Sequence, residues 1–327
     1  MEQNWAMSIK NIYNIFKKEL AFQSYSKMLI ILLLPLLFIS SGYIYVHYKN
    51  TIDSYQQFKK TEDEYKELGI DIKQALASPV KVKEGELKSE GGDGEIVENI
   101  LRFDYENFVL SLHHLEPKQS VIMTLELMGF IIFPLAFTLY AIYISSYDIR
   151  FKTVKVKAVS HDWKSVLLAK QCSVYMVMVS AVIAVVCTVY VSSLVFYSLA
   201  SRAIPVGEFT IPAVSKSNIP LQLVVVLAVS FIFSTIGFYL GVLFRSFITP
   251  ALLYIVYSLL IPALGRFDLK NLLSNLGHAV FSFSGGFKLF TPVKVDMIPV
   301  VIILAASVGL LSAVTYYMAH RQSKYVV

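Results

Sequence analysis

The side chains best suited to chemistry in this chain are a histidine pair beside a glutamate and one carboxylate within an apolar run. His113, His114 and Glu116 lie in the order HHxE, which lacks the i, i+4 spacing that places both histidines of HExxH on one helix face. We therefore expect an ordinary polar role at the membrane boundary for them. Glu126 lies inside an apolar stretch, where a carboxylate is a default candidate for a substrate path; the alternative is that it reaches the nearby interface.

Nucleotide, metal and thiol chemistry find no support in the motifs. The Walker pattern GxxxxGK[ST] is absent, and neither GGDGEIV nor SGGFKLF supplies its lysine and hydroxyl in order. Cys172 and Cys187 fall on one predicted helix, about 22 Å apart at 1.5 Å per residue, which is too far for a disulfide. We expect no catalytic, cofactor-binding or metal-ligating residue, and hence no enzyme activity in this chain itself.

The elements around these residues are those of a multi-pass membrane protein. Hydrophobic residues make up 56% of the chain and charged residues 16%, well below the roughly 25% charged residues usual in soluble domains. About 20 apolar residues are needed for a helix to cross the bilayer core. Six stretches of that kind predict an all-α polytopic fold: Met28 to Tyr48, Ser120 to Tyr147, Gln171 to Ala200, Pro220 to Phe244, Phe247 to Leu264 and Met297 to Met318.

Charge near the predicted helix ends sets the orientation. Residues 1–27, 148–170 and 319–327 are rich in Lys and Arg and are expected in the cytoplasm, whereas Lys49 to Lys118 carries ten Lys or Arg against fifteen Asp or Glu and is expected outside. Six spans with both termini inside place 265–296 outside, although that segment is basic. The net charge of +6 follows from this topology, so we expect no nucleic-acid partner.

The predicted plan has nine segments. Residues 1–27 form an amphipathic helix along the inner leaflet, with Trp5, Ile9, Ile12, Phe16 and Leu20 on its apolar face; the alternative is a signal-anchor flank. The others are a first span at 28–48, an extracellular helical insert at 49–119, a second span at 120–147, a cytoplasmic loop at 148–170, spans three to five within 171–264, an extracellular re-entrant segment at 265–296, a sixth span at 297–318 and a cytoplasmic tail at 319–327.

The two extracellular segments carry further expectations. In the insert, Thr51 to Ala77 predicts a charged helix, Lys81 to Glu95 a flexible excursion and Ile96 to Leu115 a second helix. A helical hairpin standing on spans one and two results, with a fully disordered loop as the alternative. Residues 265–296 are apolar but interrupted by glycine and proline, which predicts two short re-entrant helices or helices resting in the outer headgroups.

Gly237 and Gly241 have the small-xxx-small spacing that lets membrane helices approach closely. We predict a packing role for both glycines. The alternative is chance, because glycine is common in membrane helices.

The order of these elements resembles a type-2 permease of the ATP-binding-cassette (ABC) exporters. The resemblance covers almost the whole chain, from an N-terminal helix containing IFKKEL to a re-entrant-looking segment before the sixth span. In that family the first inner loop reads as an acidic residue, a Gly-Thr-like step, a Pro-Ser-Arg-like turn and a Leu-Gly-Lys before the third span. Comparable places here are taken by Asp148, Lys152-Thr153, Val159-Ser160-His161 and Ala169-Lys170, without the glycine and proline.

The resemblance implies an export function. Two permease subunits, identical or related, would enclose a substrate path in the cell membrane, and a separate ABC ATPase subunit with its own ATP and Mg would dock on the inner loop. The coupling residues implied are Asp148, Lys152, Thr153, Val156, Ser160, His161 and Trp163. An antimicrobial peptide, a lipid or a drug is the implied cargo.

Two other function classes stay open beside the exporter. The first is a membrane sensor or immunity protein that binds a peptide or lipid through its ectodomain and transports nothing. The second is a secondary transporter, which is disfavoured because no inverted repeat is visible. A basic loop that only fixes the topology is the simplest alternative for residues 148–170.

Overall fold

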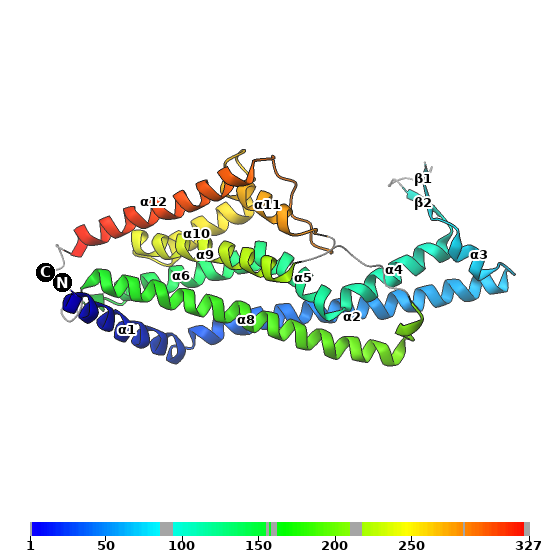
Figure 1. Cartoon of the computed structure of the whole chain (residues 1–327), viewed down its shortest axis with the longest axis horizontal. Helices are drawn as coiled ribbons and strands as arrows, with labels where there is room; N and C mark the ends of the chain where they lie inside the picture. The colour runs from blue at the N-terminus through cyan, green and yellow to red at the C-terminus, as the bar shows by residue number, and fades with distance from the viewer. Residues whose placement is uncertain are drawn as a thin grey trace. The chain divides into compact units, whose positions relative to one another are not determined.

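The chain folds into helices that divide between two compact units (Figure 1). The computed structural model describes residues 2–85, 94–154, 157, 162–209, 218–283 and 285–323. Unit 1 comprises Met1–Phe38, Ile122–Val186 and Ser217–Val327, and unit 2 comprises Ile39–Val121 and Cys187–Lys216. Helices α2 (Met28–Glu67) and α8 (Trp163–Ala203) contribute residues to both.

Unit 1 holds most of the apolar helices. Beside parts of α2 and α8 it contains α1 (Glu2–Tyr25), most of α5 (Pro117–Leu127), the π-helix η1 (Met128–Ile132), α6 (Phe133–Arg150), α9 (Ile219–Phe244), α10 (Ile248–Ile255), the π-helix η3 (Val256–Leu260), α11 (Leu269–Val280) and α12 (Met297–Ser323). The π-helix η1 ends at Ile132, two residues before Pro134. Since proline has no N–H and its ring crowds the preceding turn, a local π-bulge keeps the helix continuous there.

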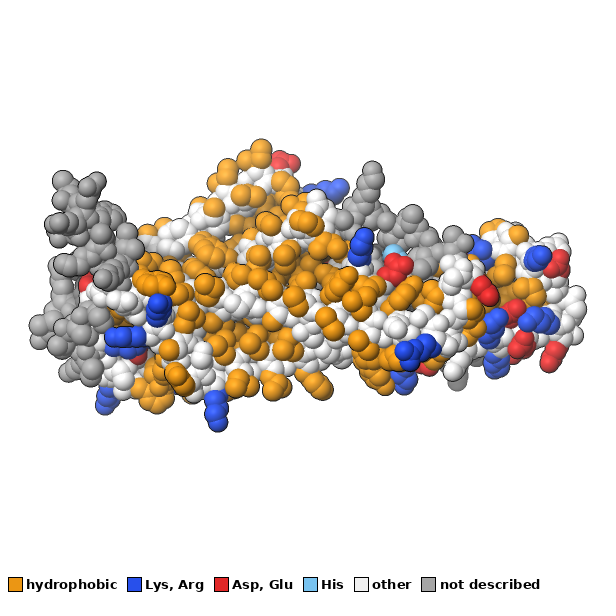
Figure 2. Space-filling view, turned by 60° about the horizontal axis from the view of Figure 1, so that its bottom comes forward, with side chains coloured by type: hydrophobic (Ala, Val, Ile, Leu, Met, Phe, Trp, Pro, Cys, Tyr) orange, Lys and Arg blue, Asp and Glu red, His pale blue; other side chains and the backbone are white. Residues whose placement is uncertain are grey.

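Five helices among the described residues are long and apolar enough to cross a membrane, so the chain is a multi-pass helical membrane protein. They contain the first, second, third, fourth and sixth predicted spans. The fifth, predicted at Phe247 to Leu264, is instead the short apolar helix Ile248–Leu260. It ends early because Pro262 follows and holds Ile261 in an extended conformation. Lys270 Nζ then caps the carbonyls of Tyr257, Ser258 and Ile261. In the space-filling view, apolar side chains cover much of the exposed surface of unit 1 (Figure 2).

The helix ends in unit 1 are ordered by side-chain contacts. Near the start of α8, Gln23 of α1 donates to Ser173 Oγ at 2.7 Å, and Tyr316 of α12 donates to Gln171 Oε1 at 3.0 Å. The first and last helices of the chain therefore meet the same end of α8. At the start of α9, Gln222 Nε2 donates to the carbonyl of Val280, the last residue of α11, at 3.4 Å.

Unit 2 is a helical insert with a core of its own. Helix α2 runs unbroken into it and is followed by α3 (Ile72–Ala77), the antiparallel strands β1 (Lys81–Gly85) and β2 (Gly94–Glu98), and α4 (Ile100–Leu115). Phe58 of α2 and Phe108 of α4 stack with ring centroids 6.2 Å apart. Phe209, just beyond the turn η2 (Val206–Glu208), meets Phe108 edge-on at 4.8 Å. Charged side chains gather around α3 and the neighbouring parts of α2 and α4 (Figure 2).

Three expectations for the segments outside the spans need correction. The charged helix expected at Thr51 to Ala77 is mainly the continuation of α2 to Glu67, because no proline or glycine interrupts it there. The flexible excursion at Lys81 to Glu95 is partly a strand pair, with Lys81 opposite Glu98, and the following helix accordingly begins at Ile100. The re-entrant segment contains one helix, α11, because Phe281 to Asp296 returns without helix in its described residues.

Polar caps place the helix starts. Four helices begin with a side chain that accepts a hydrogen bond from a backbone N–H of the first turn: Asp71 for α3, Asn99 for α4, Asn218 for α9 and Asp268 for α11. Such caps satisfy amides that the helix itself leaves unpaired and typically stabilise a helix by about 1 kcal/mol.

Candidate functional site

A buried cluster of charges lies where α6 ends and α8 begins. Asp148 and the side chain of Lys170 are each 1% exposed, and Lys170 Nζ lies 2.7 Å from Asp148 Oδ2. The ammonium also donates to the carbonyl of Ile144 at 3.1 Å. Because a buried charge is costly without a partner, the pair fixes the spacing of the two helix ends.

Lys157 extends this cluster to the N-terminal helix. Its Nζ lies 2.9 Å from Asp148 Oδ2 and 2.5 Å from Glu19 Oε1 of α1, and Glu19 is 4% exposed. Burial lowers the pKa of Lys157, but the hydrogen bond to Glu19 and the charge of Asp148 outweigh it and hold that pKa above its usual value. Two carboxylates and two ammonium groups thus form a neutral cluster that connects α1, α6, α8 and the loop between α6 and α8.

The face by which α1 meets the bundle is partly polar. Ile15, Glu19 and Gln23 are buried at intervals of four residues, whereas the predicted apolar face contains Phe16 and Leu20, which are half-buried. Gln23 bonds Ser173 through its amide N–H and accepts a hydrogen bond from Tyr140 at 2.7 Å. An amphipathic pattern identifies the helix, but specific polar contacts decide which side is buried.

The turn after α6 has a specific backbone geometry. Lys152 has a φ of 58°, in the left-handed region. Its N–H donates to the backbone carbonyl of Ile149, and the N–H of Thr153 donates to the backbone carbonyl of Asp148. These are the two hydrogen bonds of a Schellman motif, which usually has glycine at the left-handed position. Thr153 Oγ1 also donates to Asp148 Oδ1 at 2.7 Å. The turn therefore holds the Asp148 carboxylate from the side opposite the lysines.

The other predicted residues of this loop, and Phe151, which was not predicted, fall into three groups: one is buried, two are exposed and three lie outside the described residues. Trp163, the first residue of α8, is 7% exposed, so its ring packs inside this chain. Exposed side chains at the loop are Lys152 and Phe151, and Phe151 is 54% exposed. Val156, Ser160 and His161 lie outside the described residues.

A second polar group, near the start of α8, was not predicted from the sequence. The amide of Gln171 donates to the hydroxyls of Tyr175 at 2.6 Å and Tyr239 at 2.9 Å, while its carbonyl accepts from Tyr316. Tyr175 lies 2.7 Å from Thr235 Oγ1. This Gln171 hub joins α8, α9 and α12 through side chains far apart in sequence. The position of Gln171 one residue after Lys170 is the only sequence signal for it.

Glu126 is buried and fastens the return segment that follows α11. Its side chain is 1% exposed, and Oε1 accepts the N–H of Phe283 at 3.0 Å. Within the described residues no partner lies at hydrogen-bond distance from Oε2. Glu126 thus does not reach solvent in this conformation, and it sits at the joint between α5 and the return segment.

Gly237 and Gly241 lie where α9 packs against α6. A Cβ at Gly237 would overlap the backbone of Thr138, and one at Gly241 would overlap Ser145 Oγ and come 2.7 Å from the carbonyl of Ile142. Thr138 Oγ1 donates across the same contact to the carbonyl of Phe233 at 3.2 Å. The two glycines therefore set the distance between these helices.

In unit 2, the histidine pair belongs to a three-ring cluster. The ring centroid of His114 lies 5.9 Å from that of His47 and 6.4 Å from that of His113. His113 Nδ1 lies 3.0 Å from Glu116 Oε2. Among the described residues, no group of three or more His, Cys, Asp or Glu is arranged to hold a metal ion.

Comparison of the chain with protein-family models, curated proteins and solved structures finds no match.

Proposed function

We propose that this chain is the membrane-spanning permease subunit of an ABC exporter, and that the loop between α6 and α8 couples it to a separate ATPase subunit. The observation that carries the proposal is the convergence of Asp148, Thr153 and Lys170. These three residues occupy the acidic, Thr and final Lys places of the family-like loop pattern. They are 22 residues apart at most in sequence, yet Thr153 and Lys170 bond the same carboxylate.

The backbone of Lys152 gives further support. The family pattern has a Gly-like residue at this step, and this sequence lacks that glycine as well as the proline of the later turn. Lys152 nevertheless adopts the left-handed conformation that glycine favours. Glycine and lysine can therefore specify the same turn, although the non-glycine residue costs about 1 kcal/mol of strain.

Mechanical coupling follows from the charge cluster. A partner that moves the loop would also move α1 through Lys157 and Glu19, and α8 through Lys170. The Gln171 hub, one residue further along α8, would pass that displacement to α9 and α12. In this proposal ATP and Mg bind the ATPase subunit, a second permease subunit completes the path, and the cargo is an antimicrobial peptide, a lipid or a drug.

The test is co-purification of an ATPase with the tagged full chain from its own host. We expect a Walker-containing subunit in the complex and vanadate-sensitive ATP hydrolysis. Truncating the exposed aromatic ring in Phe151→Ala and reversing the charge in Lys152→Glu should lower ATPase recovery at least tenfold, because exposed anchors at such a contact typically contribute about 1.4 kcal/mol or more. Leu168→Ala, at a 40% exposed position of α8, is the matched control.

Two results would contradict the proposal. One is a chain that purifies alone, at normal membrane level, under conditions in which known exporters retain their ATPase. The other is an ATPase whose recovery is unaffected by both loop variants. Trp163→Ala is a poorer probe than Phe151→Ala, because removing a buried ring disturbs the fold of this chain directly.

A sensor or immunity protein is the second candidate. The aromatic core of unit 2, built around Phe58, Phe108 and Phe209, shows an insert with a fold of its own, as a ligand-binding ectodomain would need. Binding of a peptide or lipid to unit 2 without any stimulation of ATP turnover would favour this candidate over the exporter.

A further inference from the structure

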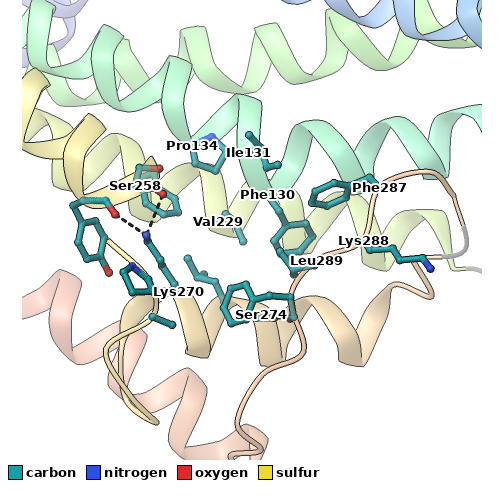
Figure 3. A pocket seen from close by; sticks show the side chains of 16 residues that line it. Phe130, Ile131, Pro134, Val229, Ser258, Lys270, Ser274, Phe287, Lys288 and Leu289 are labelled. Carbon is teal, nitrogen blue, oxygen red and sulfur yellow. Dashed lines mark hydrogen bonds between the residues drawn. The ribbon is translucent and has the colours of Figure 1, made fainter. Parts of the chain in front are cut away.

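Unit 1 contains a cavity of about 550 Å³ among η1, α9, η3, α11 and the return segment (Figure 3). This volume lies within the range of sites that hold drug-sized ligands. Its walls are mainly aromatic and aliphatic, and include Phe130, Val229, Leu273, Phe287 and Leu289. The cavity is therefore large enough for an apolar group and lined for one.

Two polar side chains of the cavity wall, Lys270 and Ser274, are already engaged. Lys270 Nζ donates to the carbonyls of Tyr257, Ser258 and Ile261, which uses all three of its N–H bonds. Ser274 Oγ donates to the carbonyl of Phe290 at 2.6 Å. Since these groups have partners of their own, a ligand inside gains little from polar atoms, and an apolar chain fits the lining best.

Hydrogen bonds between α11 and the return segment, and a glycine of α11, keep the cavity open. Asn271 Nδ2 donates to the carbonyl of Val293 at 2.9 Å, and the N–H of Val293 donates back to Asn271 Oδ1 at 2.8 Å. These bonds fasten the return segment to α11. A Cβ at Gly277 would lie 2.9 Å from Phe130 Cζ and 3.0 Å from Leu289 Cδ2. The absent side chain thus leaves room for two of the lining residues, and the space is preformed.

One lining residue of the cavity is an exposed cation. Lys288 is exposed, and Figure 3 shows its side chain extending away from the interior. Two other lining residues are exposed as well, Phe290 at 43% and Ala263. An apolar chamber with an ammonium group at its edge suits a molecule that has a hydrocarbon chain and an acidic head.

We propose that this cavity binds the hydrocarbon chain of an anionic amphiphile, with the acidic head at Lys288. A free long-chain carboxylate and an acidic membrane phospholipid share this chemistry. The site lies within one chain and does not depend on an ATPase, so the proposal stands apart from the exporter function.

Photolabelling of the full chain in phosphatidylcholine nanodiscs tests the site. The probes are palmitate and phosphatidylglycerol, each with a diazirine in the acyl chain, and a diazirine-bearing phosphatidylcholine gives the background. We expect labels on η1, on Val229 and on 273–290, at least fivefold above the label on exposed α12 residues such as Ile302. Labelling by palmitate alone identifies a free carboxylate, and labelling by phosphatidylglycerol alone identifies a lipid; both outcomes support the proposal.

Variants separate the chamber from its edge. Val229→Phe fills the chamber and Gly277→Ala pushes Phe130 and Leu289 toward it, so either variant should lower cavity labelling at least fivefold. Lys288→Glu should lower labelling by both anionic probes and leave the phosphatidylcholine label unchanged. Leu252→Phe, at a 58% exposed position outside the lining, is the control for added bulk. Monodispersity and the melting temperature verify folding; if Val229→Phe fails there, Gly277→Ala decides.

Two outcomes overturn the proposal. Cavity labelling no higher than that of α12 with every probe shows that the chamber takes no acyl chain. Equal labelling of the wild type and Lys288→Glu by the anionic probes shows that Lys288 does not select an acidic head.

Discussion

Three buried charged side chains, Glu19, Asp148 and Lys170, lie in one small cluster around Asp148. Asp148→Asn leaves Lys157 and Lys170 with a single carboxylate between them. Because an uncompensated buried charge is costly, we expect this variant to lose about 3 kcal/mol or more of stability, read as a lower melting temperature in detergent. Lys164→Met, an exposed lysine of the same helix as Lys170, should change the melting temperature little.

A double-mutant cycle tests whether the pair acts as a unit. Lys170→Met alone should destabilise the chain as strongly as Asp148→Asn. The double variant should be less destabilised than the sum of both, since removing the two charges together leaves neither alone in the interior. Strict additivity would show that Asp148 and Lys170 do not interact energetically.

The histidine cluster predicts a loss of stability in acid. Burial, followed by the nearby charges of His47 and His113, lowers the pKa of His114 to about 4 from a usual value of 6.5. Below pH 6.5 the unfolded state binds this proton more readily, so stability is complete above that pH and falls as the pH drops toward 4. Among the described residues, Glu116 is the carboxylate in contact with this cluster, through His113.

The size of this effect is modest because His114 is only partly buried. After allowance for solvent screening we expect about 1 to 2 kcal/mol between pH 7 and pH 4. Hydrogen exchange over 100–115 measures it locally, and protection there should decline in acid. His114→Phe should flatten the pH dependence, whereas His278→Phe in unit 1 should not. An unchanged profile in His114→Phe would remove this residue as the cause.

Sequence reasoning reached some of these residues and missed others for a physical reason. The resemblance of the loop to the permease family singled out Asp148 and Thr153, and the small-xxx-small spacing singled out Gly237 and Gly241. Gln171 could not be selected in this way, because its tyrosine partners come from α8, α9 and α12 and their meeting depends on the packing of whole helices. Likewise, the apolar spacing of α1 predicts a helix but not the burial of Glu19, which requires Lys157 opposite it.

Among the helix contacts, the one between α6 and α9 should tolerate added volume least, because its glycines lie against the backbone of α6. Gly241→Leu adds a side chain where Ser145 and the carbonyl of Ile142 already fill the space. We expect a loss of about 3 kcal/mol, or separation of the helices, because a packed contact tolerates extra volume poorly. Gly309→Leu on α12 is the matched control, since nothing described lies within 4 Å of its Cβ position. Equal melting temperatures for the two variants would argue against a packing role.

Element length is also where the sequence misleads. The apolar run from Phe247 to Leu264 has the composition of a span, but its helix consists of eight α-helical residues and five π-helical residues. Hydropathy does not register that Lys270 caps this helix from the following segment, since that interaction forms only when α11 folds back. The strand pair of unit 2 was missed for a local reason, because the Lys, Glu and Gly residues of 81–95 have the composition of a flexible loop.

At the scale of the whole molecule, charge alone does not settle how many times the chain crosses the bilayer. If the short helix crosses, residues 265–296, with four basic and two acidic residues, lie outside; if it does not, Arg321 and Lys324 of the tail lie outside instead. Each arrangement places a net charge of about +2 on the unfavoured side. The number of crossings must therefore be judged from the contacts at the start of α8.

Those contacts favour six crossings. Gln23 of α1 and Tyr316 of α12 both meet the start of α8, so the first and last helices end on one side. The short helix is about 20 Å long, and four apolar non-helical residues, 261–264, add about 13 Å of extended chain, which together match a core of about 30 Å.

A Cys172→Ser/Cys187→Ser background with Phe267→Cys should react with an impermeant maleimide in intact cells, because Phe267 is 60% exposed and would lie outside. A cysteine appended after Val327 should react only after permeabilisation, as should Lys152→Cys. Labelling of the appended cysteine in intact cells, with Phe267→Cys protected, would establish five crossings and place the two termini on opposite sides.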